Sequence, residues 1–187
     1  MNKTRSHRRI RALTEGAILV ALAQILSFLK LYEFPQGGSI TLEMLPIFLY
    51  CLRWGLGPGL TASAAFGLLQ LLTANYAWTW QSMLGDYLLA FTLLGLCGAF
   101  RKLRGGVYLG IVTGSAARFL SHFITGATVW SIYMPDEFFG MTMTNPWFYS
   151  LLYNGSFMAL DTLLCLVLAV LLVRNSATRK YILAEDI

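Results

Sequence analysis

Long apolar stretches separated by short polar segments run along most of the chain. A helix needs about 20 mostly apolar residues to cross the hydrocarbon core of a bilayer, and six stretches come near this length. They predict spanning helices over residues 13–31, 40–53, 56–74, 82–100, 107–127 and 149–173. The second stretch is short and contains Pro46, which favours a broken or tilted helix. We therefore expect an all-α membrane protein, a bundle of six transmembrane helices in one domain over residues 1–187.

The composition supports a lipid-embedded chain. Of the 187 residues, 57% are hydrophobic and 12% are charged, about half the charged share of an average soluble domain. The net charge of +5 does not indicate nucleic-acid binding, because the basic residues lie at the ends of apolar stretches. The first stretch is long, lacks a small-residue cleavage site and precedes further spans, so it is not read as a removable signal peptide. Three cysteines within apolar sequence are expected to be small buried hydrophobic residues: Cys51, Cys97 and Cys165.

The basic residues set the orientation. With the N terminus inside, six spans return the C terminus to the inside, and every lysine and arginine except Lys30 and Arg118 then lies in a cytoplasmic segment. This arrangement obeys the positive-inside rule, and the opposite one violates it. Both termini are therefore expected in the cytoplasm. The outer segments are aromatic, polar or acidic and contain no lysine or arginine; they are residues 32–39, 74–81 and 128–149.

Ionisable residues inside the spans are candidates for function, because they are costly in hydrocarbon. A rise of about 1.5 Å per residue places Arg118 and Asp161 at a similar depth, near the middle of the membrane. Opposite charges at one depth are expected to pair, so the two are predicted to form an ion pair between the fifth and sixth spans. The alternative role of Arg118 is to orient residues of a binding site.

A second group of polar and aromatic residues lies nearer the outer surface. Such a group provides stacking faces, a buried negative charge and several hydrogen-bonding atoms, which suit a flat, polar, cationic heteroaromatic molecule. The alternatives without a binding role are an aromatic belt at the membrane interface and, for His122, an interior histidine whose hydrogen bonds are made within the bundle. The candidate site residues are Asp86, Tyr87, His122, Trp130, Tyr149, Asn154 and, at the edge of the group, Glu43.

The sequence patterns of common catalytic sites are missing. The chain has no GxxxxGK[ST] loop, no HExxH helix, no GxSxG elbow and no Cys–His cluster with metal spacing. We therefore expect a binding protein with no catalytic residue, metal or cofactor. One alternative is an intramembrane enzyme that uses Asp86 and Asp161, although their depths differ by roughly 10 Å. Another is a purely structural membrane protein.

The first span carries two small residues, Ala17 and Ala21, four positions apart. Small residues at this spacing let membrane helices approach each other closely. The pair predicts either internal packing or a docking face for another membrane protein.

Several motifs occur in an order and spacing that are more specific together than any of them alone. They are RALTEGAILVALA in the first span, GGSITLEMLPI (37–47), the RWG…G turn (53–59), DYLLAF (86–91), His122 with Trp130 eight residues later, and Tyr149 with Asn154 five residues later. With these motifs nearly the whole chain resembles the thiamine-specific substrate-binding (S) components of energy-coupling factor (ECF) transporters. The resemblance implies a bacterial plasma-membrane protein that binds thiamine near its outer face. It also implies delivery of thiamine with a transmembrane coupling subunit and two cytoplasmic ATPases.

The resemblance further implies roles for the candidate residues. Asp86, which stands where the family has a glutamate, would accept hydrogen bonds from the aminopyrimidine. Trp130 and His122 would stack on the two rings of the vitamin. Polar contacts would come from Tyr87, Tyr149 and Asn154, an aromatic contact from Tyr32 or Phe34, and docking on the coupling subunit from Ala17 and Ala21. The nearest alternative is an S component for another small vitamin or precursor, such as hydroxymethylpyrimidine, riboflavin or a related cation.

Overall fold

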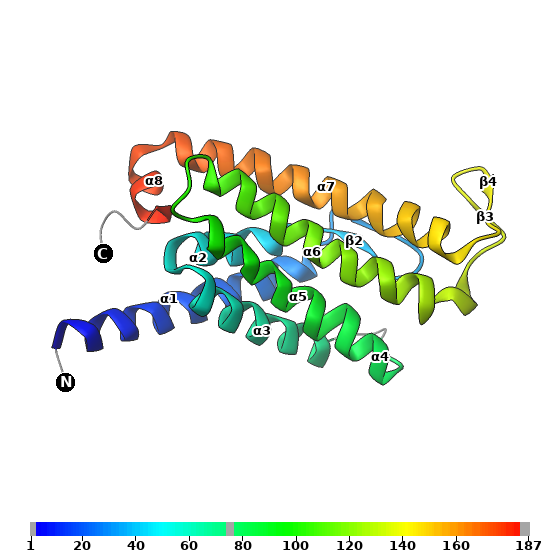
Figure 1. Cartoon of the computed structure of the whole chain (residues 1–187), viewed down its shortest axis with the longest axis horizontal. Coiled ribbons are helices and arrows are strands. Elements are labelled where there is room, and N and C mark those ends of the chain that lie inside the picture. Colours follow the sequence, from blue (N-terminus) through cyan, green and yellow to red (C-terminus); the bar gives the residue numbers. More distant parts are fainter. Residues whose placement is uncertain (1–2, 74–76, 184–187) are drawn as a thin grey trace.

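Long apolar helices running roughly side by side make up the protein (Figure 1). The computed structural model describes residues 3–73 and 77–183, with side chains from residue 6 onward. Within these residues, five helices are long and apolar enough to cross a membrane. They are α1 (Lys3–Phe28), α3 (Leu56–Thr73), the continuous helix Trp80–Phe100, α6 (Gly106–Thr128) and α7 (Pro146–Arg174). Five of the six predicted stretches are thus confirmed as spanning candidates, with ends that differ by a few residues except at the start of α1.

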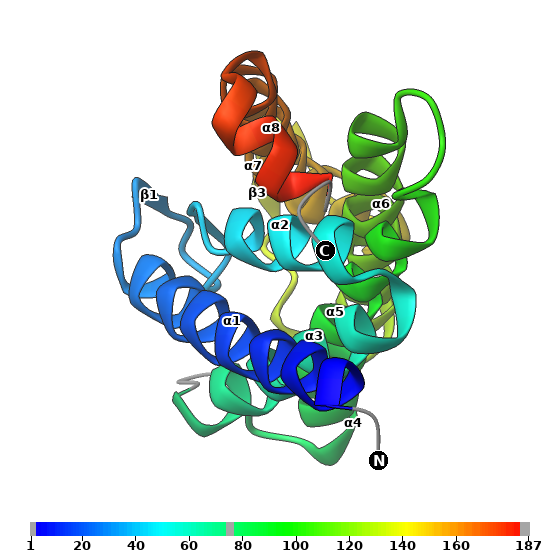
Figure 2. The same ribbon diagram turned by 90° about the vertical axis from the view of Figure 1, so that its left-hand side faces the viewer.

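The sixth predicted stretch, residues 40–53, forms a shorter helix, α2 (Met44–Trp54). At about 1.5 Å per residue its 11 residues are too few to cross a bilayer by themselves, but they return the chain toward the end where α1 begins (Figure 1). Nine of them are buried, and the helix contacts α1, α3, α6, α7 and α8. In Figure 2 it lies between α1 and α7. An apolar helix enclosed on all sides is a core element, and α2 is therefore the centre of the bundle.

The helix over residues 80–100 is irregular along its length. It begins with α4 (Trp80–Ser82), continues as a π-helix, η1 (Met83–Leu89), and ends with α5 (Ala90–Thr92) and a 3₁₀-helix, η2 (Leu93–Phe100). A capping box starts it: the Thr79 hydroxyl accepts from the Ser82 N–H at 3.1 Å, and the Ser82 hydroxyl accepts from the Thr79 N–H at 3.3 Å. The π-helical turn rotates the residues that follow it relative to those before it.

Short hairpins and turns connect the helices. β1 (Tyr32–Glu33) pairs antiparallel with β2 (Ser39–Ile40) between α1 and α2. Between α6 and α7 lie a 3₁₀ turn, η3 (Ser131–Tyr133), and a second hairpin of β3 (Glu137–Phe138) and β4 (Met141–Thr142). The last helix of the described residues is short, α8 (Ser176–Ile182), and folds back against α2 and α7.

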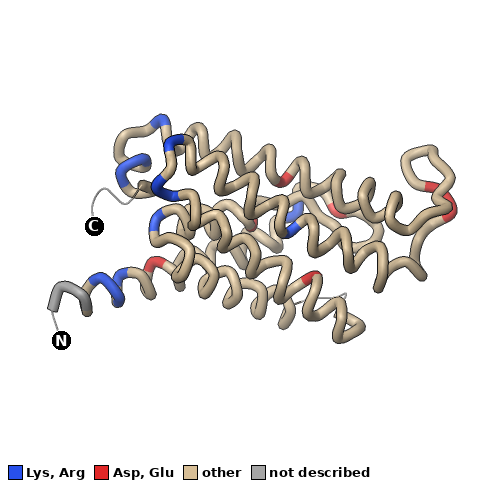
Figure 3. The backbone as a smooth tube through the Cα atoms, in the orientation of Figure 1, with Lys and Arg blue, Asp and Glu red and all other residues tan. Residues whose placement is uncertain are grey.

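The two chain ends lie at the same end of the bundle, and most of the basic residues gather there (Figure 3). The exposed members of this group include Arg8, Lys102, Arg104, Arg174 and Arg179. The opposite end carries the hairpin of β3 and β4. This separation matches the predicted orientation, in which the basic end faces the cytoplasm.

Arg53 is an exception, because it lies inside the basic end rather than on its surface. Its side chain is 0% exposed and donates from Nε to the Glu15 carboxylate at 2.6 Å. It also donates to the Tyr181 backbone carbonyl and lies 3.9 Å from the centre of the Tyr181 ring. The Trp54 indole N–H adds a hydrogen bond to Glu15 at 2.8 Å. One guanidinium therefore joins α1, α2 and α8.

Close helix packing depends on a few glycines, of which Gly98 is the clearest. A Cβ atom at Gly98 would lie 2.5 Å from the backbone carbonyl carbon of Gly55 and 2.7 Å from the backbone nitrogen of Leu56. Backbone atoms cannot move aside as a flexible side chain can, so even one methyl group is excluded. Gly98 thereby lets η2 pack directly on the turn between α2 and α3.

We predict that Gly98→Ala lowers the free energy of unfolding by about 1–3 kcal/mol, the usual cost of overpacking a well-packed interior. Gly57→Ala is the matched control, because nothing lies within 4 Å of a Cβ atom at Gly57. Thermal unfolding in detergent should show a lower midpoint for Gly98→Ala and an unchanged or higher one for Gly57→Ala. Equal midpoints for the two variants would contradict the close packing.

Candidate functional site

Asp86 lies in the π-helix η1, where the chain passes close to α6. The carbonyl of the preceding residue, Gly85, accepts a hydrogen bond from the Ser121 hydroxyl at 2.6 Å. A Cβ atom at Gly85 would lie 2.1 Å from Cγ2 of Thr125, so only glycine allows this approach. The wider turn of a π-helix often occurs at functional sites. Here it brings a carboxylate against the polar face of α6.

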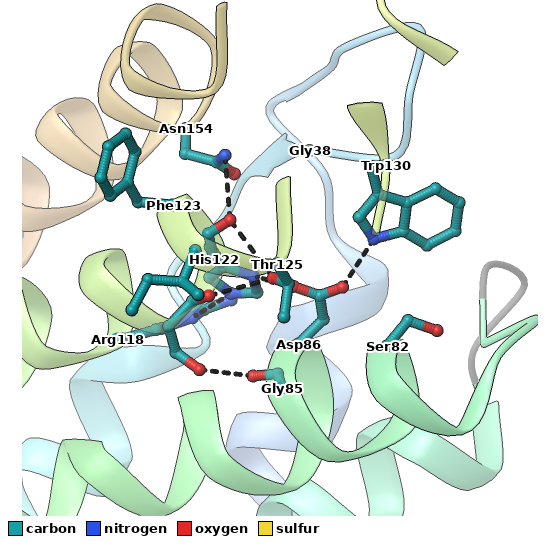
Figure 4. Close-up of polar contacts among 12 residues, drawn as sticks. Gly38, Ser82, Gly85, Asp86, Arg118, His122, Phe123, Thr125, Trp130 and Asn154 are labelled. Atoms are coloured by element: carbon teal, nitrogen blue, oxygen red, sulfur yellow. Dashed lines mark hydrogen bonds and ion pairs between the residues drawn. The ribbon is translucent and has the colours of Figure 1, made fainter. Parts of the chain in front are cut away.

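The Asp86 carboxylate is surrounded by hydrogen-bond donors (Figure 4). Oδ1 lies 3.0 Å from Nδ1 of His122 and also accepts from the Thr125 hydroxyl. Oδ2 accepts from the indole N–H of Trp130 at 2.7 Å. The Asp86 and His122 side chains are each 13% exposed. Hydrogen bonds to the charged form stabilise a carboxylate in such a place, so these donors favour a negative charge within an apolar bundle.

Arg118 lies one turn below His122 on α6 and connects it to a second carboxylate. Arg118 donates from Nε to Nε2 of His122 at 3.3 Å and from Nη2 to Glu43 at 2.8 Å. The other Glu43 oxygen accepts from Gln70 at 2.9 Å, and the guanidinium lies 4.2 Å from the centre of the Phe91 ring. A chain of polar contacts therefore runs from Glu43 through Arg118 and His122 to Asp86.

The predicted ion pair between Arg118 and Asp161 is wrong. Arg118 pairs with Glu43, which lies at the start of α2 deep in the bundle. Asp161 instead accepts a hydrogen bond from the backbone N–H of Thr41 at 2.9 Å. The short, buried α2 is the physical reason, because it places a carboxylate from the first loop at the depth of Arg118.

Asn154 braces α7 against α6 at the level of His122. Its amide nitrogen lies 3.3 Å from the His122 backbone carbonyl and 3.0 Å from the Ser150 hydroxyl. The Ser150 hydroxyl in turn donates to the Phe123 carbonyl at 2.7 Å. Asn154 thus lies on the same side of the bundle as His122 and helps to hold the α6 backbone in place.

A cluster of aromatic rings lies next to His122. The His122 and Phe157 ring centres are 6.3 Å apart, and Phe157 packs near Phe34 and Tyr153. The Tyr153 hydroxyl accepts from the Gly38 N–H at 2.8 Å. We define the aromatic cluster as Phe34, Phe138, Tyr149, Tyr153 and Phe157, joined by ring contacts of 5.5–6.2 Å.

Tyr149, a candidate from the sequence, belongs to this aromatic cluster. It is 6% exposed, and its hydroxyl donates to the Gln36 side chain in the first loop. Sequence reasoning missed Gln36 and Tyr153, although both lie within segments that it examined. The only available indication for Tyr153 was its place one turn after Tyr149, on the same face of a helix.

Trp130 forms a second aromatic group with two residues from the outer segments. Its ring centre lies 5.6 Å from Trp78 and 5.8 Å from Tyr133. The remaining candidate, Tyr87, is half-buried next to Asp86 and packs against the hydrophobic core. The structure therefore brings Asp86, His122 and Trp130 into direct contact, places Asn154 and Tyr149 around them, and links Glu43 to them through Arg118.

The arrangement combines one carboxylate, a neutral hydrogen-bonding surface and several stackable rings. Among the residues that the structure describes, no group of three or more His, Cys, Asp or Glu side chains could hold a metal ion. The three cysteines are free and buried, as the sequence predicts. A cation with an aromatic ring is the ligand that such a set of groups fits chemically.

Comparison with known proteins identifies the family of the chain. The family model described as Thiamine transporter protein (Thia_YuaJ) matches residues 13–181. The thiamine transporter ThiT of Bacillus subtilis is 33% identical over 181 residues, which cover 88% of this chain and 91% of that protein. ThiT of Lacticaseibacillus paracasei is 29% identical over 185 residues, 89% of each chain.

The fold also matches a solved structure. ThiT from Listeria monocytogenes superposes with a TM-score of 0.79 at 24% identity, covering 91% of this chain and 98% of the other. The family match extends over most of the chain and includes every candidate residue of the site. The chain therefore belongs to the thiamine transporter family, whose members are the thiamine-specific S components of ECF transporters.

Proposed function

We propose that the chain binds thiamine at Asp86. The site lies between the aromatic cluster and the Trp130 group, away from the end of the bundle where the basic residues gather. As a member of its family it is a thiamine-uptake component of the membrane, not an enzyme. The observation that carries the proposed site is the Asp86 carboxylate, 13% exposed and held by donors from α6 and Trp130. One buried negative charge among aromatic rings favours a flat cation over neutral or anionic molecules.

The contacts suggest how the vitamin lies. A carboxylate has about four lone-pair positions, and His122, Thr125 and Trp130 use three. The remaining one, on Oδ2, is suited to an amino group of the aminopyrimidine. Rings of Trp130 and His122 then offer stacking faces. Polar contacts at the rim would come from Tyr87, Tyr149 and Asn154.

The first-loop aromatic contact is assigned to Phe34 rather than Tyr32. Phe34 is 9% exposed and packs against Tyr153 and Phe157, within the aromatic cluster. Tyr32 is 56% exposed and, among the ring contacts described, packs against Phe34 alone. Glu43 is assigned a supporting role, since it holds Arg118 rather than the rings.

The proposed partners are a transmembrane coupling subunit and two cytoplasmic ATPases, as in other ECF transporters. Ala17 and Ala21 are both exposed on α1, whereas Gly16 and Val20, each one position earlier, face the interior. This exposure argues against internal packing as the reason for the small pair. A flat, small-residue strip on a lipid-facing helix favours close contact with another membrane helix.

We expect Asp86→Asn to weaken thiamine binding by about 2 kcal/mol or more, because it removes the negative charge and leaves buried donors unmatched. Asp136→Asn is the control, since Asp136 is an exposed carboxylate of the outer loop. Isothermal titration of the purified proteins measures both. Unchanged affinity in Asp86→Asn would remove Asp86 from the site.

A competition series distinguishes thiamine from the alternative ligands. Hydroxymethylpyrimidine keeps the aminopyrimidine but lacks the cationic ring, so it should displace labelled thiamine only at much higher concentration. Riboflavin lacks the charge and should not compete. Equal displacement by hydroxymethylpyrimidine and thiamine would show that the site recognises the pyrimidine alone.

We expect the double substitution Ala17→Leu/Ala21→Leu to abolish thiamine uptake by cells while leaving binding to the purified chain unchanged. Bulky side chains would prevent close approach of a partner helix without touching the site. Ala116→Leu, at an exposed position on α6, is the control for added bulk on a lipid-facing surface. Normal uptake in the double variant would place the docking face elsewhere.

A further inference from the structure

We propose that Arg118 is a positioning residue that keeps His122 uncharged, with its proton on Nδ1, so that the Asp86 charge stays available to a cationic ligand. The proposal deepens the proposed function and rests on it for the identity of the ligand. It depends on two contacts, one at each nitrogen of the same imidazole.

The contact at Nε2 decides the protonation pattern. Arg118 donates from Nε to Nε2 of His122 at 3.3 Å. A guanidinium has only donors and does not lose its proton in proteins. Nε2 must therefore accept, and an accepting nitrogen carries no hydrogen. If Nε2 of His122 also carried a proton, its N–H would point at the N–H of Arg118.

The contact at Nδ1 is consistent with this assignment. Nδ1 lies 3.0 Å from Oδ1 of Asp86, and a neutral imidazole has one donor and one acceptor. With Nε2 as the acceptor, Nδ1 is the donor, and it donates to the carboxylate. Both ring nitrogens are then satisfied without a charge on the ring.

Charged groups from four elements surround His122 and Arg118, and two of them hold Arg118 in place. Asp86 from η1 and Arg118 from α6 touch the imidazole directly. Behind Arg118, Glu43 at the start of α2 holds Nη2 at 2.8 Å, and Asp161 of α7 interacts with Arg118 electrostatically. Glu43 is 7% and Arg118 6% exposed. A buried pair of this kind is held firmly, because breaking it strands a charge.

The consequence for binding follows from charge. An imidazolium beside Asp86 would cancel its negative charge and repel a cationic ring. With Arg118 as the donor to Nε2, the pair of Asp86 and His122 keeps a net charge of about −1. Arg118 therefore tunes the site without touching the ligand.

Nitrogen-15 NMR of His122 tests the proposal directly. In a His7→Gln background His122 is the sole histidine, so selective ¹⁵N-histidine labelling of the full chain in detergent reports on it alone. We expect a protonated, pyrrole-type Nδ1 and an unprotonated, pyridine-type Nε2 at neutral pH. A protonated Nε2, in a neutral or doubly protonated ring, would overturn the proposal.

The variant Arg118→Met/Glu43→Gln removes the donor and its partner together, so that neither charge is stranded. Without the donor, His122 can pair with Asp86 as an imidazolium. The doubly protonated form should then increase on acidification in this variant and not in the parent chain. Thiamine affinity should fall at least about tenfold at the acid end. Arg104→Met, which removes an exposed charge, should match the parent chain in both measurements.

Thiamine titrations on the same samples separate this proposal from the proposed function. If the double variant keeps the tautomer and pH behaviour of the parent chain, Arg118 does not set the state of His122 and the proposal fails. If the NMR results are as expected but the parent chain does not bind thiamine, the proposed ligand is wrong and the tautomer assignment stands.

Discussion

The buried ion pair of Arg118 and Glu43 is the interaction on which the site depends. In a bundle surrounded by lipid, an uncompensated guanidinium is costly, so its partner fixes both where it lies and what it can reach. The 2.8 Å contact joins the start of α2 to the middle of α6. Once the guanidinium is held there, its Nε–H meets His122, and His122 in turn meets Asp86. The central helix and the binding group are parts of one polar chain.

Most of the fold could be predicted from the sequence, because length and apolar character alone identify a spanning helix. Residues 56–74, 107–127 and 149–173 were predicted close to their observed ends, although residue 74 itself lies outside the described residues. The start of α1 was missed, since its polar first turns carry no apolar pattern. The central place of α2 was missed for another reason: nothing in a short apolar run tells whether lipid or protein surrounds it.

Less of the site could be predicted, and the limits have a physical cause. Helix rise gives the depth of a residue, so Asp86, His122 and Trp130 were recognised as neighbours in depth, and they touch. Depth does not give the direction of a side chain around its helix, which is why Asp161 was chosen as the partner of Arg118 and Glu43 was not. Contacts from loops, such as Gln36 with Tyr149, depend on hairpin geometry that has no periodic pattern.

The π-helical segment Met83–Leu89 gives Asp86 a dependence on chain length as well as on residue type. A single-residue deletion there would relax the wide turn into an ordinary α-helix, and each residue of an α-helix turns the chain by about 100°. The carboxylate would swing out of line with α6 although no functional side chain had been replaced. Sequence alignments that shift this segment by one column would likewise compare the acid with a glycine or a tyrosine, so gap placement here decides which residue is compared with Asp86.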